Sequence, residues 1–326
     1  MIEDALLSEI AVVYVSWNTR EELGRSLNAL RVPGGQGLEF VVVDNASSDG
    51  TVVMLEEGFP GVRVIANPDN RGFATAFNQG WRATDRPFVL LMNPDVILPV
   101  DALRALCGCI RAHPPVGVIA PVLVDEDGGD TESARPFPPL TLRLLGGELP
   151  DHGEALDLSG CPGAVAVHWL MGACCLFRRE ALEATGGFDE GFFLYGEDID
   201  WALRAWRAGW TVAQLSGLTA VHLGHRSAVQ VAPMITTMRR HDGYFRYLAQ
   251  AHGPWAARGN YLWWLLRAGL AAMLLAPAAA LNPALRPRLS HEWGRLWYCL
   301  THLGRPLARA QFGRNHAPAD SSQEER

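Results

Sequence analysis

Two stretches near the N-terminus decide the fold: Ile10–Ser16, which reads IAVVYVS, and Phe40–Val43, which reads FVVV. Both are continuous apolar runs, and such runs are typical of strands that are buried on both faces of a parallel sheet. Between them, Thr19 is expected to cap a helix that carries Glu21 and Glu22 in its first turn. A strand, a helix and a second strand in this order predict an α/β fold.

The same alternation continues along the first 125 residues. Further strands are expected at Val62–Ala66, Phe88–Met92 and Val116–Ala120, and further helices from Ser48, over Gly72–Ala83 and over Asp101–Ala112. This rhythm predicts an open, mostly parallel sheet that binds its ligands at the carboxyl ends of the strands.

The second part of the chain is less regular. Residues 125–163 are rich in glycine and proline and predict a long loop, and order is expected to return at Ala164–Phe177. Helices from Arg178 and over Asp198–Ala208 and short strands at Thr211–Gln214 and Thr219–His222 follow. We expect a first domain over residues 1–228, a helical extension over 229–312 and a disordered tail over 313–326.

Composition excludes several classes of protein and of chemistry. Of the 326 residues, 48% are hydrophobic and 19% charged, which excludes a disordered chain. All 28 basic residues are arginine, which excludes Schiff-base and P-loop lysine chemistry. The six cysteines form no CxxC motif and are expected to be reduced, buried thiols of a cytosolic protein rather than a zinc site or a disulfide framework. The acidic N-terminus lacks the basic region of a signal peptide.

The net charge of −7 hides an asymmetry. Residues 1–238 contain 16 arginines and 30 acidic residues, whereas residues 239–326 contain 12 arginines and 5 acidic residues. The acidic body argues against nucleic acid as a partner at the main site, and the basic end indicates an anionic surface near it.

The apolar segment Tyr261–Leu281 (YLWWLLRAGLAAMLLAPAAAL) has the length of a membrane span. Arg267 inside it and Pro277 near its end count against a spanning helix. A helix in the membrane interface, anchored by Trp263 and Trp264, is favoured, and an ordinary buried helix or a contact in a homo-oligomer remains the alternative.

Polar motifs follow several of the expected strands, each with a structural alternative. Asp44 can accept hydrogen bonds from a base or a ribose, or can form an Asx turn. Arg71, at a helix start, suits a diphosphate, although alone it is better read as a surface cation. Asn93-Pro94-Asp95 could hold a divalent cation together with substrate phosphates, or could be a simple turn.

The strongest local signal is GGFDEGFFLYGEDIDW at residues 186–201, with several carboxylates in an apolar setting. Asp200 is expected to pair with Arg204 one helical turn away and so to be structural. Glu197 and Asp198 remain as candidates for chemistry. His222 follows, in a position where a lone histidine is more often structural than a ligand.

Taken together and in this order, the sequence resembles the family-2 glycosyltransferases of the GT-A fold, and within them the rhamnosyltransferase-like branch. The blocks that carry the resemblance, over roughly residues 10–227, are VSWN, VVDNASSDGT, NRGFATAFNQG, LLMNPDV, WLMGACCLFRRE, GGFDEGFFLYGEDIDWALRAWRAGW and HLGHRS. The resemblance implies a Rossmann-like, mostly parallel mixed sheet flanked by helices, with a donor half over about 1–125 and an acceptor half over about 126–228.

The resemblance also implies roles for matching residues. Asp198 would be the catalytic base with Glu197 beside it, and Asp95 and His222 would hold Mg²⁺ or Mn²⁺ on the donor diphosphate. Asn93 departs from the acidic DxD motif and leaves the cation one carboxylate fewer. The nucleotide-sugar would be bound by Ser16, Asp44, Asn45, Arg71, Gly72, Asn78, Asn93 and Asp95. The acceptor and sugar pocket would include Trp169, Gly172, Ala173 and His225.

The expected function is therefore inverting transfer of a sugar from a nucleotide-diphosphate donor, dTDP-L-rhamnose being favoured. The acceptor would be a hydroxyl of a saccharide, either free or polyprenyl-linked, at the inner face of the cytoplasmic membrane. The alternatives are a UDP- or GDP-sugar donor, a nucleotidyltransferase and a non-catalytic scaffold with this fold. A nucleotidyltransferase is disfavoured because residues 10–20 contain neither glycine nor lysine.

Overall fold

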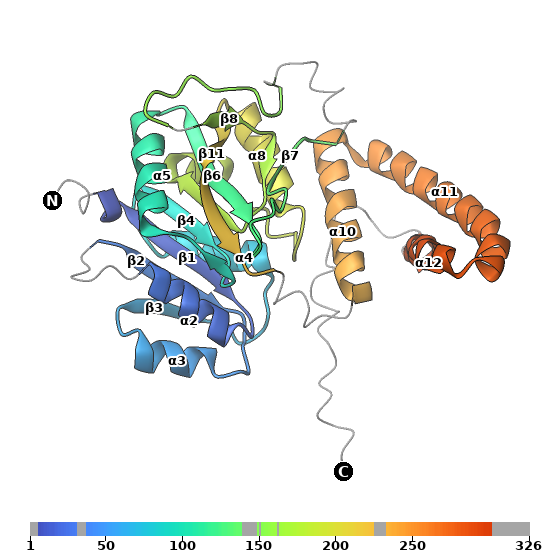
Figure 1. Ribbon diagram of the computed structural model, residues 1–326, viewed down its shortest axis with the longest axis horizontal. Coiled ribbons are helices and arrows are strands. Elements are labelled where there is room, and N and C mark those ends of the chain that lie inside the picture. The colour runs from blue at the N-terminus through green and yellow to red at the C-terminus, as the bar shows by residue number, and fades with distance from the viewer. Residues whose placement is uncertain are drawn as a thin grey trace, which may run out of the picture.

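The computed structural model describes residues 6–30, 37–138, 149, 151–161, 163–224 and 233–301 (Figure 1). An α/β domain comes first in the chain, and the C-terminal helices lie beside it.

The first half of the domain is a parallel sheet. Its strands lie in the order β3-β2-β1-β4, and the chain crosses between them through α2, α3 and α4. The bounds are β1 Ile10–Ser16, α2 Arg20–Ala29, β2 Glu39–Asp44, α3 Thr51–Gly58, β3 Val62–Ala66, α4 Phe73–Arg82 and β4 Phe88–Met92. The expected strands are confirmed. Thr19 occupies the N-cap of α2, but its side chain makes no capping hydrogen bond to the backbone of the first turn. Its hydroxyl is instead hydrogen-bonded to the Ser16 hydroxyl at 3.0 Å.

The second half makes the sheet mixed. The elements are β5 Val96–Ile97, α5 Val100–Ala112, β6 Val116–Val124, β8 Ala164–Ala166, β10 Cys174–Arg178, α7 Arg179–Thr185, α8 Glu197–Arg207 and β11 Thr211–His222. Strand β10 runs antiparallel between β4 and β6, while β11 runs parallel to β6 and carries β5 and β8 antiparallel to itself. The two short strands expected at 211–222 are one strand, β11, whose register shifts between Leu215 and Thr219. A separate two-stranded ribbon pairs β7 Ala134–Arg135 with β9 Trp169–Leu170.

Helices cover both faces of the sheet. The core on one face is built with α2, α3 and α5, and the core on the other with α4, α7, α8 and the C-terminal helices. The strand residues point alternately into the two cores: Val12 and Tyr14 into the first, Val13 into the second. This two-sided burial explains why the strands are continuous apolar runs.

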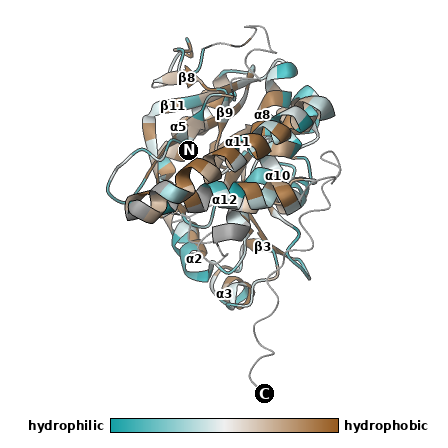
Figure 2. Ribbon diagram, turned by 90° about the vertical axis from the view of Figure 1, so that its right-hand side faces the viewer, coloured by the Kyte–Doolittle hydropathy of each residue, from teal (hydrophilic) through white to brown (hydrophobic). Residues whose placement is uncertain are grey.

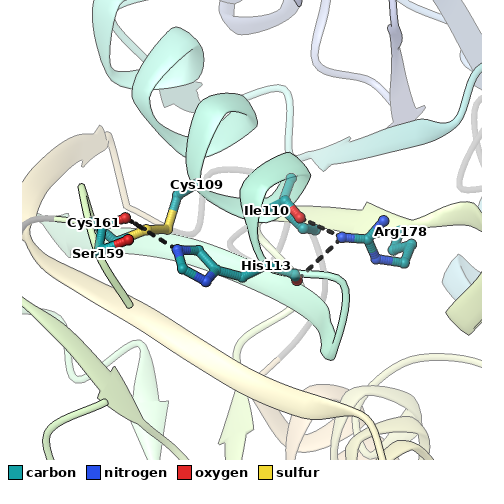
Figure 3. The surroundings of a disulfide bond; sticks show 6 residues. All are labelled: Cys109, Ile110, His113, Ser159, Cys161 and Arg178. Atoms are coloured by element: carbon teal, nitrogen blue, oxygen red, sulfur yellow. Dashed lines mark hydrogen bonds between the residues drawn. A yellow bond between two sulfur atoms is a disulfide. The ribbon is translucent and has the colours of Figure 1, made fainter. Parts of the chain in front are cut away.

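The expectation that all cysteines are reduced is wrong for one pair. Cys109 on α5 and Cys161 in the loop before β8 form a disulfide with a Cα–Cα distance of 5.5 Å (Figure 3). Beside it, the His113 ring is hydrogen-bonded to the Ser159 carbonyl at 3.1 Å. The pairing depends on the path by which the loop returns over the end of α5, and the sequence spacing does not encode that path. The other four cysteines are buried free thiols, as expected.

The C-terminal extension is helical, as expected, wherever the structure describes it. It consists of α10 Pro233–His252, α11 Pro254–Leu281, the short 3₁₀ helix η1 Pro283–Leu285 and α12 Arg286–Thr301. Helix α10 packs against α8 of the α/β domain and against α11, and α11 packs against α12. Within the described residues, none of the helices is both long and apolar enough to cross a membrane. The expected tail over 313–326 lies outside the described residues.

Candidate active site

A pocket of about 1070 Å³, open mouth included, lies at the carboxyl ends of β1 and β4. It combines polar and aromatic side chains that come from both halves of the domain and from α10. Its lining includes Trp17, Asn45, Gly72, Phe73, Asn93, Asp95, Gly172, Phe193, Tyr195, Glu197, Asp198, His222, Thr236 and Arg239. The pocket therefore lies where the sequence predicts the site, at the carboxyl edge of the parallel strands.

Asp44 and Asn45 occupy the tip of β2. One Asp44 carboxylate oxygen, Oδ2, accepts a hydrogen bond from the Ser47 backbone N–H at 2.8 Å. The other oxygen, Oδ1, is buried and has no hydrogen-bond partner among the described residues. A buried acceptor of this kind favours a ligand that donates to it. The Asn45 amide donates to the Gly72 carbonyl at 3.2 Å and so ties β2 to the start of α4.

Gly72 is required where α4 begins. Its φ is +85°, and a Cβ on it would stand 2.6 Å from the Phe193 carbonyl oxygen, which accepts a hydrogen bond from the Phe73 N–H at 2.7 Å. The segment before α8 is thus held directly on the start of α4 because residue 72 has no side chain. The neighbouring Arg71 is exposed and lies outside the lining of the pocket.

Asn78 does not reach the pocket. It is fully buried, its amide nitrogen donates to the Phe188 carbonyl at 2.8 Å, and its amide oxygen accepts from the Phe188 N–H and the Trp81 indole. These bonds hold the segment after α7 against α4, so the structure assigns Asn78 a structural place rather than the nucleotide contact that the resemblance implies.

Asp95 and His222 come together through the pairing of β5 with β11. Val96 stands opposite His222 in this antiparallel pair, and the imidazole Nε2 lies 3.3 Å from Asp95 Oδ1. Both side chains are buried, and Asn93 lines the pocket beside them. A carboxylate and an imidazole at this separation fit a divalent cation that takes its remaining ligands from substrate phosphates and water.

Three further potential metal ligands gather away from the pocket. They are Cys109, His113 and Cys161. Because the two sulfur atoms are bonded to each other, they offer no thiolates to a metal.

Glu197 and Asp198 begin α8 and face the same pocket. Asp198 accepts hydrogen bonds from the backbone N–H groups of Ile199 at 2.9 Å and Gly172 at 3.3 Å. Glu197 is more deeply buried, and its Oε2 has no hydrogen-bond partner among the described residues. Asp200 is paired with Arg204 at 2.8 Å, as expected, and is not among the residues that line the pocket.

The surroundings shift the proton affinities of the two carboxyls to different extents. Burial raises the pKa of Glu197 well above its ordinary value, and the Asp198 charge raises it further. Burial also raises the pKa of Asp198, but backbone N–H donors partly offset this effect by stabilising its anion. These effects favour Asp198 over Glu197 as the first of the two carboxyls to ionise.

The residues expected in the acceptor pocket are distributed unevenly. Gly172 lines the pocket, whereas Ala173 is buried and contributes its carbonyl to a hydrogen bond with the Asn93 N–H. Trp169 lies on the β7–β9 ribbon, where its indole donates to the Pro136 carbonyl at 3.1 Å, and it is outside the pocket lining. His225 lies outside the described residues.

Sequence reasoning missed the contribution of α10. Arg239 lines the pocket and lies over the Phe193 ring at 4.4 Å, and Thr236 lines the pocket one turn earlier. Gly243 allows α10 to approach the segment before α8 closely, since a Cβ at residue 243 would clash with the Tyr195 carbonyl. Tyr195 itself has a φ of +73°, an uncommon conformation for a tyrosine. No motif in residues 229–252 pointed to this contact.

Several known proteins are similar to this chain in sequence or in structure. The model of the family described as glycosyl transferase family 2 matches residues 11–186. The N-acetylglucosaminyl-diphospho-decaprenol L-rhamnosyltransferase of Mycobacterium tuberculosis is 30% identical over 80% of this chain and 90% of its own length. The rhamnosyltransferase WbbL of Escherichia coli K12 is 27% identical over 48% of this chain and 60% of its own length. The structure of a Pyrobaculum calidifontis mannosyltransferase in complex with GDP-Man and Mn²⁺ superposes with a TM-score of 0.54 at 21% identity, over 90% of this chain and 86% of that one.

Proposed function

Since the chain belongs to glycosyltransferase family 2 and has the mixed, mostly parallel α/β sheet of the GT-A fold, we propose that it is an inverting glycosyltransferase acting on a polyprenyl-diphosphate-linked saccharide. One observation carries the proposal. The Glu197–Asp198 pair and the Asp95–His222 pair line one and the same pocket.

In the proposed reaction, Asp198 accepts the proton of the acceptor hydroxyl. The acceptor oxygen forms a bond to the anomeric carbon of the donor sugar on the face opposite the diphosphate, and the bond to the diphosphate oxygen breaks. The electron pair of that bond leaves with the nucleoside diphosphate. General base catalysis of this kind contributes roughly 10²–10⁴-fold. Glu197 remains neutral beside Asp198 and keeps a second negative charge away from the base.

Asp95 and His222 would hold the divalent cation, and their chemistry fits Mn²⁺ better than Mg²⁺ because an imidazole is one of the two protein ligands. Bound there, the cation would supply charge stabilisation for the leaving diphosphate. Asn93 is neutral, so the protein alone gives the cation one carboxylate.

The donor half over residues 1–125 contributes Asp44, whose unpartnered Oδ1 suits a donor from the base or the ribose. The favoured donor is dTDP-L-rhamnose, because two relatives are named as rhamnosyltransferases. Arg239 is the one arginine among the lining residues of the pocket in the described part of the chain. It suits a phosphate oxygen of either substrate, because a guanidinium forms strong charge-assisted hydrogen bonds with phosphate.

The acceptor class is supported by the mycobacterial relative, whose name gives a saccharide on a polyprenyl diphosphate as its acceptor. Such an acceptor would place the enzyme at the inner face of the cytoplasmic membrane, in the synthesis of a cell-surface polysaccharide. Transfer from a UDP- or GDP-sugar, or binding without catalysis, are the alternatives.

The test is a transfer assay with dTDP-rhamnose, UDP-sugars and GDP-sugars, each with Mn²⁺ and with EDTA, using N-acetylglucosaminyl-diphospho-polyprenol as acceptor. We expect a glycosylated lipid from dTDP-rhamnose with Mn²⁺. Transfer from another donor would change the proposed donor sugar and leave the proposed glycosyltransferase activity in place. Failure to bind or turn over any nucleotide-sugar, judged by thermal shift and product release, would leave a scaffold as the better account.

A further inference from the structure

Helix α11 is built with its large apolar side chains on the outside. The exposed residues recur along one side of the helix, two turns apart between Trp255 and Leu262 and then every three or four positions: Trp255, Leu262, Leu266, Leu270 and Met273, with Trp263 and Leu274 at the flank. Trp255 is 78% exposed, Leu266 61% and Met273 65%. We refer to these seven side chains as the apolar face.

The opposite side of α11 is the one that packs against protein. Apart from Tyr261, its fully buried residues are alanines, at positions 257, 268, 272 and 279. A helix in a water-soluble domain normally places its large apolar residues inward and its polar ones outward. In α11 the side that packs against protein combines these alanines with Tyr261 and Trp264, while a row of leucine, methionine and tryptophan side chains faces outward, where a water-soluble helix normally has polar residues.

Helix α12 repeats the pattern. Trp293, Trp297 and Leu300 are spaced four and three apart and are about half exposed. Figure 2, turned so that α11 and α12 face the viewer, shows the hydrophobic colour running along α11. A contiguous apolar surface of this kind marks an interaction site.

The charges around the apolar face are almost all positive. Residues 254–301 contain five arginines and one acidic residue, Glu292. That carboxylate is neutralised by Arg267 at 3.0 Å and by Arg295 at 3.2 Å. The remaining arginines include Arg258, which lies over the Trp255 ring at 5.0 Å. Tryptophan next to arginine is the combination that anchors a helix at a lipid–water boundary.

We infer that the apolar face docks on an anionic lipid surface, with α11 lying in the plane of the membrane. The apolar side chains would enter the boundary of the acyl chains, and the arginines would meet anionic headgroups. A second copy of the chain is a poorer occupant, because a two-fold contact would set the same positive charges against each other.

This docking goes beyond the transfer reaction and connects to it through α10. Helix α10 packs against α11 and also carries Arg239 in the pocket, so one helix lies between the membrane-facing surface and the site. A lipid-linked acceptor would then have its diphosphate close to the pocket.

The test is co-sedimentation of the full chain with vesicles of phosphatidylcholine, with or without phosphatidylglycerol, at low and high salt. No sugar donor is present, so the outcome is independent of the transferase proposal. We expect binding that requires phosphatidylglycerol and weakens with salt. The double variant Leu266→Glu/Leu270→Glu should bind at least about tenfold more weakly, because two exposed leucines would no longer enter the lipid.

Val53→Glu is the matched control. Val53 is also an exposed apolar residue, at 54%, but it lies on α3 of the α/β domain, and its substitution should leave binding unchanged. All variants should keep the wild-type melting temperature, since no buried contact is altered. Wild-type protein that stays in the supernatant with anionic vesicles at low salt would overturn the inference. A dimer in analytical ultracentrifugation that the double variant dissociates, without any vesicle binding, would assign the face to a second copy instead.

Discussion

At the residue scale, two adjacent carboxyls differ because of their backbone surroundings. Asp198 receives two backbone N–H bonds, whereas Glu197 Oε2 is buried with none. The pKa of Glu197 is therefore raised more strongly than that of Asp198, which favours Asp198 as the first of the two to ionise. A base and a neutral neighbour at the start of one helix follow from this difference.

We expect Asp198→Asn to reduce kcat by two or more orders of magnitude while donor binding and melting temperature change little. Glu197→Gln is the matched variant, because it mimics the protonated Glu197 and should keep most of the activity. Steady-state kinetics and donor titration check both. Near-normal turnover in Asp198→Asn, with loss in Glu197→Gln, would exchange the two roles.

The pH dependence of the reaction provides a second test of Asp198 as the base. A base acts only when ionised, and the pKa of Asp198 is raised, so kcat/KM should fall with decreasing pH at values above the ordinary carboxyl range of about 4. Glu197→Gln should leave this acid limb near its wild-type position. A limb that disappears in Glu197→Gln would contradict the assignment.

If Asp95 and His222 hold a divalent cation, the contribution of Asp95 to nucleotide binding should depend on that cation. Asp95→Ala should weaken nucleoside diphosphate binding far more in Mn²⁺ than in EDTA, because the carboxylate acts through the cation. Isothermal titration of wild type and variant with the nucleoside diphosphate, under both conditions, measures this difference. Equal weakening in the two would mean that Asp95 acts without a metal.

At the element scale, the start of α4 supports the segment that leads into α8. Gly72→Ala should destabilise the protein by about 2 kcal/mol or more, because the new Cβ meets the Phe193 carbonyl and the backbone is left-handed. It should also lower kcat, since Phe193–Asp198 must move. Gly58→Ala, in α3 with open space around it, should be neutral or slightly stabilising. Urea unfolding of both variants makes the comparison, and equal stability would show that the close approach is not required.

Elements were predictable where a local pattern decides them. The strands β1 and β4 have their predicted bounds, because strands buried on both faces of a sheet are almost wholly apolar. The sequence predicts two strands where the structure has one, β11. Residues Ser216–Leu218 have the pattern of a break, but the strand continues through them with a shift in register. The Asp95–His222 proximity needs the β5–β11 pairing, and the Cys109–Cys161 bond needs a returning loop, so residue patterns alone could not derive either. The family resemblance implied that Asp95 and His222 act together, but it gave no indication of the disulfide bond.

At the scale of the whole molecule, charge and shape divide the chain into an acidic catalytic body and a basic, outwardly apolar helical end. The body would repel an anionic membrane, while the end would be attracted to it, so the chain has one favoured orientation on a lipid surface. In that orientation α10 lies between the membrane and the pocket. Under the proposed function, both parts would then act on the same lipid-linked acceptor.

This arrangement makes turnover depend on how the acceptor is presented. With an acceptor embedded in anionic vesicles, salt and Leu266→Glu/Leu270→Glu should each raise the apparent KM about tenfold, because both weaken partition of the enzyme to the surface. With a short-chain, water-soluble acceptor carrying the same saccharide diphosphate, the double variant should leave kcat unchanged, since none of the side chains of the apolar face lines the pocket. Initial rates on the two acceptors, with Val53→Glu as control, measure the contrast. If the double variant loses activity equally on both acceptors, α11 acts on the fold of the site and the orientation argument fails.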